Sequence, residues 1–217
     1  MKVDSDNWNI SNNCSLDSWI STVVPEDVCR REGHSTMIAE IREQLRGERP
    51  SCVVTCVGGG GLLYGVLRGL DAAGWADVPV VAMETPGAAS FHASVQAGRL
   101  VTLEKIDTVA TCLGALTVIP ELLGELATHT IFSELVPDRE TINACLRFAD
   151  DHRMLVEPAC GATLAAIYSG VVSRLRGEGR ISTVGPTVVI VCGGVGVDTG
   201  LLQGWKQQFG LDSAATL

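Results

Sequence analysis

The stretch Val53-Val54-Thr55-Cys56-Val57-Gly58-Gly59-Gly60-Gly61-Leu62-Leu63 decides the fold of this chain. Its first half is a short run rich in β-branched residues, which predicts a strand covered on both faces. Four glycines follow, and an apolar helical pattern then continues from Leu62 to about Ala73. A strand that runs through a glycine turn straight into a helix is typical of α/β proteins.

The same alternation extends in both directions along the chain. A helix is predicted from Ser35, and Pro50 ends it. Further strands are predicted at 78–83, 131–136 and 187–191, with helices at 116–128, at 138–151, after Pro158 and at 201–208. Short apolar strands that alternate with helices predict an α/β fold, a mostly parallel sheet with helices on both faces.

The composition is that of a globular protein. Hydrophobic residues make up 46% of the 217 residues and charged residues 19%, which supplies the core of one domain or two small ones and excludes a disordered chain. No apolar run approaches the ~20 residues that cross a bilayer. The net charge of −9 argues against wrapping a polyanion. We therefore expect a small-molecule ligand, and neither a nucleic acid nor a membrane.

The N-terminal region differs from the rest of the chain. Residues 1–31 are polar and unpatterned, and no continuous apolar segment marks a secretory signal there. We predict a disordered leader over 1–31 and a folded domain over 32–217. Without a secretory route, the eight cysteines are expected to be reduced thiols in a cytoplasmic protein.

The four glycines are the strongest candidate for a ligand site. Without Cβ atoms they let a ligand approach the backbone, and they adopt positive φ freely. The helix that follows adds unpaired N–H groups and the positive end of its dipole, so a phosphate fits there without a basic side chain. The alternative is a tight turn that binds nothing.

The spacing of these glycines excludes two common phosphate loops. A P-loop needs Gly-Lys-Ser/Thr at its end, whereas Gly61 is followed by Leu62. A dinucleotide fingerprint needs a third glycine where this chain has Leu63 or Tyr64. A small monophosphate held by the backbone alone remains, and pyridoxal phosphate meets that demand.

Two further candidates follow predicted strands. Cys192 ends the strand at 187–191, where a thiol would face the crevice in which open α/β sheets bind ligands; a buried, purely structural cysteine is the alternative. Glu84 closes the strand at 78–83 and is either a surface cap or one ligand of a cation completed by carbonyls. The small residues of the stretch 155–162 favour close helix packing.

Several motifs then occur in a fixed order along the chain: Val57-Gly58-Gly59-Gly60-Gly61-Leu62-Leu63, Ala82-Met83-Glu84-Thr85, Ser90-Phe91-His92-Ala93, Leu155 to Ala162 and Val189-Ile190-Val191-Cys192-Gly193-Gly194. From about Glu32 to Leu211 they resemble the L-serine dehydratase family, which belongs to the fold type II pyridoxal-phosphate enzymes. The resemblance implies β-elimination of L-serine, and of L-threonine, with pyruvate and ammonia as the products from serine.

The resemblance also implies roles for matching positions. Cys192 would face the pyridine nitrogen of the cofactor; a thiol does not enforce a pyridinium as a carboxylate would, which suits rapid β-elimination. The cofactor phosphate would be held by the N–H groups of Gly58, Gly59, Gly60 and Gly61. A monovalent cation, potassium in the family, would be bound by Glu84 and by carbonyls of Gly58, Ala88, Leu113 and Ala115. The family further implies a homodimer.

The chain departs from the family in one respect. The Schiff-base lysine of the family, in a Ser-x-Lys stretch followed by Gly and Asn, is not found, because Lys2, Lys105 and Lys206 are the only lysines and none has that context. Arginine cannot replace it, since it never offers a free amine. The chain resembles the C-terminal part of a dehydratase. Because the Schiff-base lysine is not found in it, we assign it no catalytic residue and expect no useful serine dehydration from this chain alone.

Other interpretations stay open at this point. The chain would also fit a truncated isoform that acts as a binding or regulatory subunit and pairs with a full-length subunit, or a truncated gene model. A β-replacement enzyme or a racemase of the same superfamily is a further alternative, against which Cys192 and the four-glycine loop argue. Faces that a missing region would cover are expected to favour association.

Overall fold

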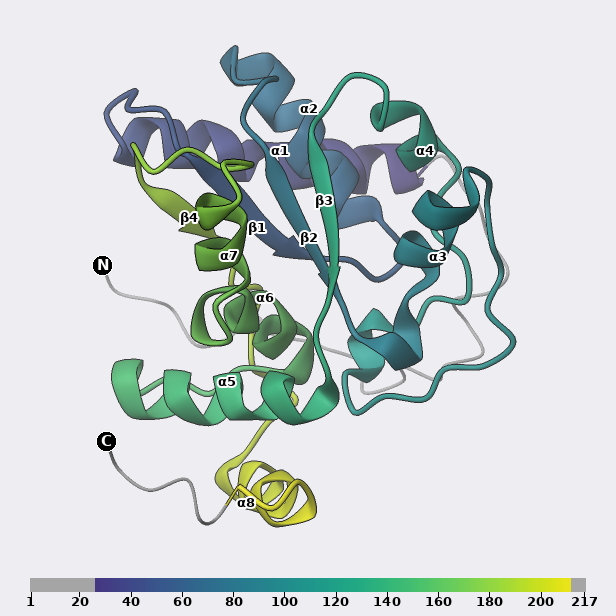
Figure 1. The fold of residues 1–217 in the computed structure, drawn as a ribbon, viewed down its shortest axis with the longest axis vertical. Coiled ribbons are helices and arrows are strands. Elements are labelled where there is room, and N and C mark those ends of the chain that lie inside the picture. The colour runs from purple at the N-terminus through teal and green to yellow at the C-terminus, as the bar shows by residue number, and fades with distance from the viewer. Residues whose placement is uncertain (1–25, 212–217) are drawn as a thin grey trace.

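The computed structural model describes residues 26–211. They form helices around a four-stranded parallel sheet, whose strands lie in the order β3-β2-β1-β4 (Figure 1). All three strand pairs are parallel. The strands are β1 (Cys52–Cys56), β2 (Val80–Glu84), β3 (Ile131–Leu135) and β4 (Thr187–Val189). The predicted α/β class with a parallel sheet is confirmed.

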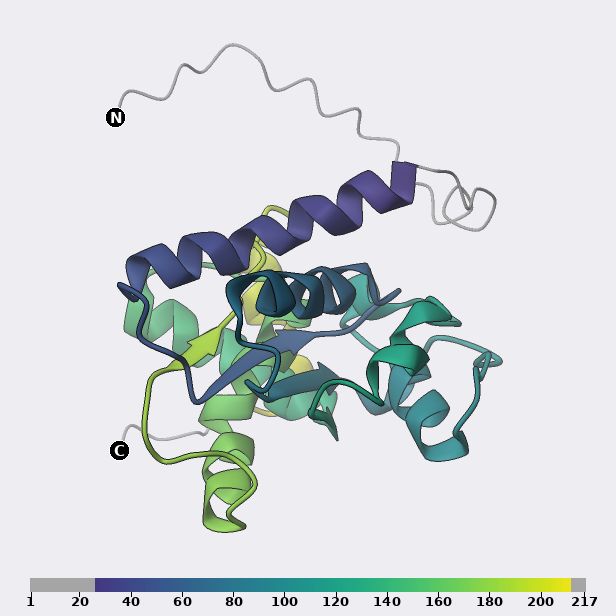
Figure 2. The ribbon, with the colours of Figure 1, turned by 90° about the horizontal axis from the view of Figure 1, so that it is seen from above.

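Helices cover both faces of this sheet, as the view in Figure 2 shows. One face carries α1 (Glu26–Gln44) and α2 (Gly61–Ala73), and the other carries α5 (Asp138–His152), α6 (Pro158–Tyr168) and α7 (Val171–Gly177). The remaining elements are η2 (Pro86–Ala88), α3 (Ser90–Ala97), η3 (Thr111–Leu113), α4 (Glu121–Glu125) and α8 (Thr199–Gln208). Within residues 26–211, no helix combines the length and the apolar character that a membrane span requires.

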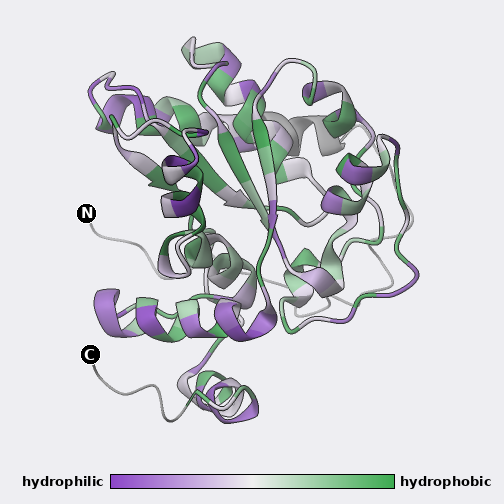
Figure 3. Cartoon of the chain, in the orientation of Figure 1, coloured by the Kyte–Doolittle hydropathy of each residue, from purple (hydrophilic) through white to green (hydrophobic). Residues whose placement is uncertain are grey.

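Side-chain alternation along the strands divides the core into two parts. Cys52, Val54 and Cys56 of β1 belong to the cluster that includes α6, whereas Val53 belongs to the cluster that includes α2. Every residue of β1 and β2 is buried, as expected for strands covered on both faces. Figure 3 shows the same pattern, with apolar strands inside and polar residues along the outer side of α5.

α6 owes its central place to small residues. Residues 158–166 of this helix are all buried, because the sheet lies on one side of it and α5 on the other. A Cβ atom on Gly161 would lie 2.4 Å from the Thr141 carbonyl oxygen and 2.5 Å from Cys145 Sγ, both on α5. The two helices therefore approach each other more closely than a side chain at position 161 would permit, which agrees with the packing role expected for this stretch.

The first helix begins earlier than the sequence pattern predicted. It starts at Glu26 and not at Ser35, so residues 26–31, which we assigned to the leader, are helical. The sequence Pro25-Glu26-Asp27 has the form of a helix start, since proline suits the first turn and acidic residues favour the N-terminal end of the dipole. Residues 1–25 of the predicted leader lie outside the described residues.

The helix predicted at 116–128 is largely wrong, because only α4 forms within it. Pro120 has no N–H to donate, and the backbone before it bonds to distant segments instead. The Ile119 N–H donates to the Gly59 carbonyl at 3.0 Å, and the Leu116 carbonyl accepts from Leu103 at 2.8 Å. This segment therefore supports the glycine turn, a tertiary role that a helical pattern does not reveal.

The contact at Gly161 gives a first prediction. We expect Gly161→Ala to lower the free energy of unfolding by about 1–3 kcal/mol, because the added methyl group overpacks the α5–α6 contact. Urea denaturation followed by circular dichroism measures this. Gly204→Ala in α8 is the matched control, since a Cβ there meets nothing within 4 Å and alanine favours a helix. Equal stability of the two variants would contradict the packing argument.

Candidate active site

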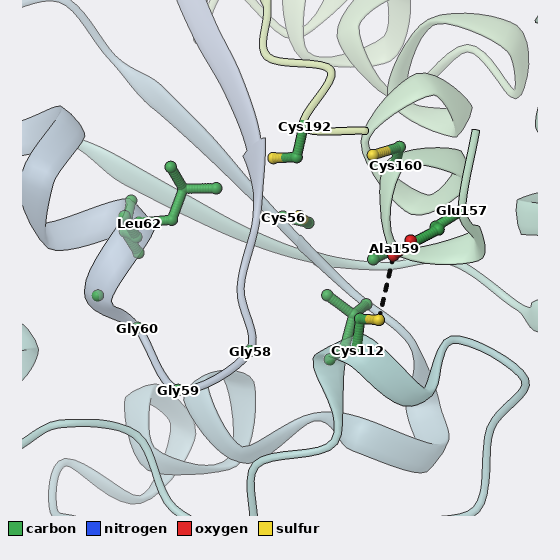
Figure 4. A pocket seen from close by; sticks show the side chains of 13 residues that line it. Cys56, Gly58, Gly59, Gly60, Leu62, Cys112, Glu157, Ala159, Cys160 and Cys192 are labelled. Carbon is green, nitrogen blue, oxygen red and sulfur yellow. Dashed lines mark hydrogen bonds between the residues drawn. The ribbon is translucent and has the colours of Figure 1, made fainter. Parts of the chain in front are cut away.

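The candidate site lies at the carboxyl ends of β1 and β4. The chain leaves β1 for β2 on one side and later returns to β4 on the other, so the crevice between β1 and β4 is the switch point where open α/β sheets bind ligands. A cavity of about 250 Å³ opens there (Figure 4). Its lining comprises Cys56, Gly58, Gly59, Gly60, Gly61, Leu62, Leu63, Cys112, Leu113, Glu157, Ala159, Cys160 and Cys192.

Two of the four glycines are required by the fold itself. Gly60 has a φ of +94° and precedes α2 in the left-handed conformation, which favours glycine. A Cβ on Gly58 would lie 3.0 Å from the Cys112 carbonyl oxygen, so η3 packs directly against the backbone of the turn. Side chains at positions 58 and 60 would displace neighbouring groups.

The other two glycines leave open space for a ligand. A Cβ on Gly61 would meet nothing within 4 Å, and one on Gly59 would only touch the Ala115 Cβ at 3.9 Å. The fold would therefore accept a side chain at either position, and both residues line the cavity. The absent Cβ atoms therefore leave backbone exposed to whatever occupies the cavity.

The electrostatics of this turn suit an anion. The first N–H groups of α2 have no partner within the helix, and neither a side-chain cap nor an acidic residue satisfies them in the first turn. They carry the positive end of the helix dipole. The described residues that line the cavity include no lysine or arginine, so an anion there would meet main-chain N–H groups and no basic side chain.

Cys192 lies across the cavity from the glycine turn, as Figure 4 shows. It follows β4, is exposed, and faces the crevice, so the alternative of a buried structural cysteine is wrong. The Cys160 thiol lowers the pKa of Cys192 by a hydrogen bond, but the contact with Cys56, desolvation and the Glu157 charge outweigh it and raise the pKa to about 12. At neutral pH the side chain is therefore an uncharged thiol.

Glu157 joins three segments around the cavity. Its N–H donates to the Gly193 carbonyl at 3.0 Å, which fixes the start of α6 against the loop after β4. Its carboxylate accepts from the Gly196 N–H at 3.1 Å and from the Cys112 thiol at 3.1 Å. One acidic side chain thus holds the loop of Cys192 and the η3 segment in place at the same time.

Glu84 is buried and does not act as a surface cap. It ends β2 with no exposed surface, and its carboxylate accepts from the N–H groups of Phe91 at 2.9 Å and His92 at 2.7 Å. Those groups belong to the first turn of α3, so this glutamate caps a helix that starts six residues later in the chain. Burial raises the pKa of the Glu84 carboxyl to about 7, although both hydrogen bonds oppose the shift.

The remaining predicted cation ligands lie in the glycine turn, at the end of η2 and at or just after the end of η3. Ala88 ends η2 and Leu113 ends η3, and both side chains belong to one buried cluster. Gly58 lies against Leu113, whose Cα would be 3.4 Å from a Cβ at position 58, and the Leu113 carbonyl accepts from Ala115 N–H at 2.8 Å. Within residues 26–211, no three His, Cys, Asp or Glu side chains are grouped to hold a metal ion, so any cation here would depend on carbonyl oxygens.

Sequence reasoning missed several residues of the site. Cys56, Cys112, Cys160 and Glu157 all line the cavity, although no spacing rule marked them. A high cysteine count was the only signal for the thiols. Glu157 stands directly before Pro158, which marks the start of a helix but says nothing about a cavity.

The fold and site define an α/β protein with a glycine-lined cavity at the switch point of its sheet. A family model described as pyridoxal-phosphate dependent enzyme matches residues 16–193, and the chain belongs to this family. The match begins within the leader predicted at 1–31.

Within this family, the chain is similar to serine dehydratases and to an L-serine ammonia-lyase. A Rattus norvegicus protein named L-serine dehydratase/L-threonine deaminase is 50% identical over 195 residues, which cover 89% of this chain and 53% of that protein. A Mus musculus serine dehydratase-like protein is 50% identical, with 89% and 59% covered. The crystal structure of an L-serine ammonia-lyase from Rhizomucor miehei matches with a TM-score of 0.77 and 38% identity, over 82% of this chain and 56% of that one. The chain thus spans just over half the length of these relatives.

The buried Glu84 carboxyl predicts a specific pH dependence. Its pKa is about 7 in the folded chain and near 4.5 when exposed, so its contribution to stability is present below pH 4.5 and is lost as the pH rises through 7. In a buffer without sodium or potassium, we expect the free energy of unfolding of the wild type to fall by roughly 1–3 kcal/mol more than that of Glu84→Gln across this range. Chemical denaturation at several pH values measures the difference.

The control for this measurement is Glu104→Gln, which replaces an exposed glutamate by the same amide. Its stability should follow the wild-type pH curve. Parallel curves for the wild type and Glu84→Gln would show that Glu84 titrates alike in the folded and unfolded chains.

Proposed function

We propose that this chain holds pyridoxal phosphate through the main chain of Gly58, Gly59, Gly60 and Gly61, as the cofactor-binding part of an L-serine and L-threonine dehydratase. The observation that carries the proposal is the open cradle at Gly59 and Gly61, beside unpartnered N–H groups and without a basic side chain. The chain is about 50% identical in sequence to proteins named L-serine dehydratase/L-threonine deaminase, which supports L-serine and L-threonine as the substrates.

Pyridoxal phosphate, when bound, supplies the electron-withdrawing ring that makes loss of the substrate hydroxyl feasible. The residues of this chain position that ring. The α2 N–H groups and the helix dipole favour the dianionic phosphate end. Cys192, an uncharged thiol on the opposite side of the cavity, would keep its proton at sulfur and offer a hydrogen bond to the pyridine nitrogen. Glu157 ties the loop of Cys192 to η3, which packs against Gly58.

The amine that removes the substrate α-proton does not come from the described lysines. Lys105 is exposed and pairs with Asp107 at 2.7 Å, and Lys206 lies on α8; neither lines the cavity. We therefore propose that dehydration requires a second segment carrying a lysine, supplied by a full-length subunit that pairs with this chain as in a homodimer. A chain acting only as a binding or regulatory subunit is the second candidate, and the same lack of a lysine at the cavity favours it.

We also propose a monovalent cation, potassium, bound by Glu84 and by the carbonyls of Gly58, Ala88, Leu113 and Ala115. The fully buried Glu84 carboxylate supports this, because a charge without a nearby cation is costly in the interior. Repeating the Glu84 stability measurement at pH 8 with potassium chloride or tetramethylammonium chloride tests the site. Potassium should raise the stability of the wild type and leave Glu84→Gln unaffected.

A cytoplasmic location is part of the proposal. Among the described side chains, six cysteines take no part in a disulfide: Cys52, Cys56, Cys112, Cys145, Cys160 and Cys192. Thiols without disulfides are typical of a reducing compartment.

The glycine cradle predicts that charge at position 61 decides cofactor binding. Gly61→Asp should fold at least as stably as the wild type, because the side chain enters open space and an acidic residue favours a helix N-terminus. It should weaken binding of pyridoxal phosphate by about tenfold or more, since a negative charge then faces the phosphate. Tryptophan fluorescence titration and thermal protection by the cofactor measure this.

Gly61→Asn is the matched control, because it has nearly the same size and no charge. We expect it to retain more of the binding than Gly61→Asp, and the difference should shrink at high salt. If both variants bind the cofactor as tightly as the wild type, the phosphate lies elsewhere.

The lack of a lysine at the cavity predicts an inactive chain. With added pyridoxal phosphate and L-serine, the purified chain should form no pyruvate above background in a coupled assay with lactate dehydrogenase. A full-length dehydratase serves as the positive control. Turnover close to that of the control would show that this chain supplies the amine after all.

A further inference from the structure

The loop between α3 and η3 has no regular structure, yet it leads into the segment that braces the glycine turn. Residues 98–110 form neither helix nor strand, and η3 itself has only three residues. η3 nevertheless packs against Gly58, where a Cβ would lie 3.0 Å from the Cys112 carbonyl oxygen. The Ile119 N–H, a few residues further on, donates to the Gly59 carbonyl at 3.0 Å. Contacts outside regular structure must therefore hold this loop in place.

Asp138 provides two of these contacts from the start of α5. One carboxylate oxygen accepts from the Thr108 hydroxyl at 2.6 Å, and the other accepts from the Val109 N–H at 3.0 Å. Both bonds have a charged acceptor, and such bonds are roughly twice as strong as bonds between neutral groups. Asp138 is the first residue of α5, which packs closely against α6, so the loop is anchored to a well-packed helix.

Thr108 extends this anchor to the sheet and to η3. Its hydroxyl donates to Asp138 and accepts from the Thr85 hydroxyl at 3.0 Å and from the Ala110 N–H at 3.1 Å. The one donor and both lone pairs of this hydroxyl are thus used. Thr85 directly follows β2 and is fully buried, and Ala110 directly precedes η3. One hydroxyl therefore joins the end of β2, the start of α5 and the start of η3.

A main-chain contact of the same loop does not replace this network. The Asp107 N–H donates to the Gly87 carbonyl at 2.9 Å, which fixes the loop just before Thr108. The bonds of Asp138 fix it at Thr108 and Val109, closer to η3. A substitution at Asp138 or Thr108 therefore releases the end of the loop that leads into η3.

We propose that Asp138 is a positioning residue for the cofactor cradle, acting through Thr108 and η3 on the glycine turn. A main-chain site binds well when its N–H groups already point to one place, because ordering them during binding costs free energy. Glycine is conformationally permissive, so the direction of the N–H groups in the turn depends on the segment packed against it. The inference rests on the proposed function, since it concerns the same cofactor site, although Asp138 does not line the cavity.

Hydrogen exchange of the full chain, followed by mass spectrometry, tests this anchor without any cofactor. Asp138→Asn keeps the size of the side chain but replaces one acceptor oxygen by an NH2 group, so the Thr108 hydroxyl or the Val109 N–H loses its acceptor. Peptides that cover 108–119 should then exchange about tenfold faster or more than in the wild type, because a bond to a charged group is lost. Peptides from β1 should exchange as in the wild type, which distinguishes local release from a loss of global stability.

Glu140→Gln is the matched control for the exchange measurement. Asp138 and Glu140 are the two acidic residues in the first turn of α5, so each variant loses one negative charge near the positive end of the helix dipole. Glu140 accepts from Arg139 at 3.3 Å and from Ser169 at 3.2 Å, and its substitution leaves the contacts of the loop in place. Its exchange over 108–119 should follow that of the wild type.

Equilibrium dialysis of the full chain with pyridoxal phosphate measures the effect on the cradle. Asp138→Asn should weaken binding by about threefold to tenfold, whereas Glu140→Gln should bind as the wild type does. Thr108→Val removes the hydroxyl and leaves the carboxylate, and it should weaken binding in the same way. Thr108→Ser restores the hydroxyl and should recover the binding, which a purely space-filling role of Thr108 would not predict. Circular dichroism confirms that each variant is folded, and the two Thr108 variants carry the test if Asp138→Asn does not fold.

Two results would overturn the inference alone. One is unchanged exchange over 108–119 in folded Asp138→Asn. The other is a wild-type chain that binds pyridoxal phosphate while folded Asp138→Asn and Thr108→Val bind it equally well. If the wild type itself does not bind pyridoxal phosphate, the proposed function is wrong and this inference is wrong with it.

Discussion

The structure depends on how closely two backbones approach at the glycine turn. η3 lies against Gly58, and Ile119 donates to the Gly59 carbonyl, so a segment sixty residues later in the chain braces the turn between β1 and α2. This contact leaves the start of α2 at the crevice, where its first N–H groups have no partner within the helix and no side-chain cap among the described residues. Glycine is required at positions 58 and 60 because neighbouring groups approach closely there, whereas the main chain at Gly59 and Gly61 has open space beside it.

Two buried or partly buried carboxylates organise the surroundings of that turn. Glu84 caps α3 from the end of a strand, and Glu157 joins α6 to the loop of Cys192 and to η3. In both cases a carboxylate accepts hydrogen bonds from backbone N–H groups. This is favourable, because a buried N–H group without an acceptor costs free energy. The acidic character of the chain is thus partly structural, and the described lining of the cavity contains no basic side chain.

The described residues bring the glycine turn to the cavity but bring no lysine there. The glycine turn, Cys192 and Glu157 come from elements whose packing is internal to residues 26–211, and they need no further segment for their positions. Chemistry at a substrate α-carbon needs a free amine, and the described lysines lie outside the cavity. In the proposed function, cofactor binding and catalysis are therefore separable, and the relatives are almost twice as long as the part that this chain matches.

The sequence by itself determined the parallel α/β fold and the strand–glycine–helix unit with its four glycines, whereas the tertiary structure decided that Gly59 and Gly61 are the two with open space beside them. The features that the sequence determined are local, because β-branched runs, glycine and helical periodicity act over a few neighbouring residues. Only the tertiary structure decided that 116–120 would brace the turn and not form a helix, that Glu84 would be buried as a cap, and that four thiols would share one cavity. Each of these depends on which distant segment meets which, and contacts between segments far apart along the chain leave no periodic signal in either one.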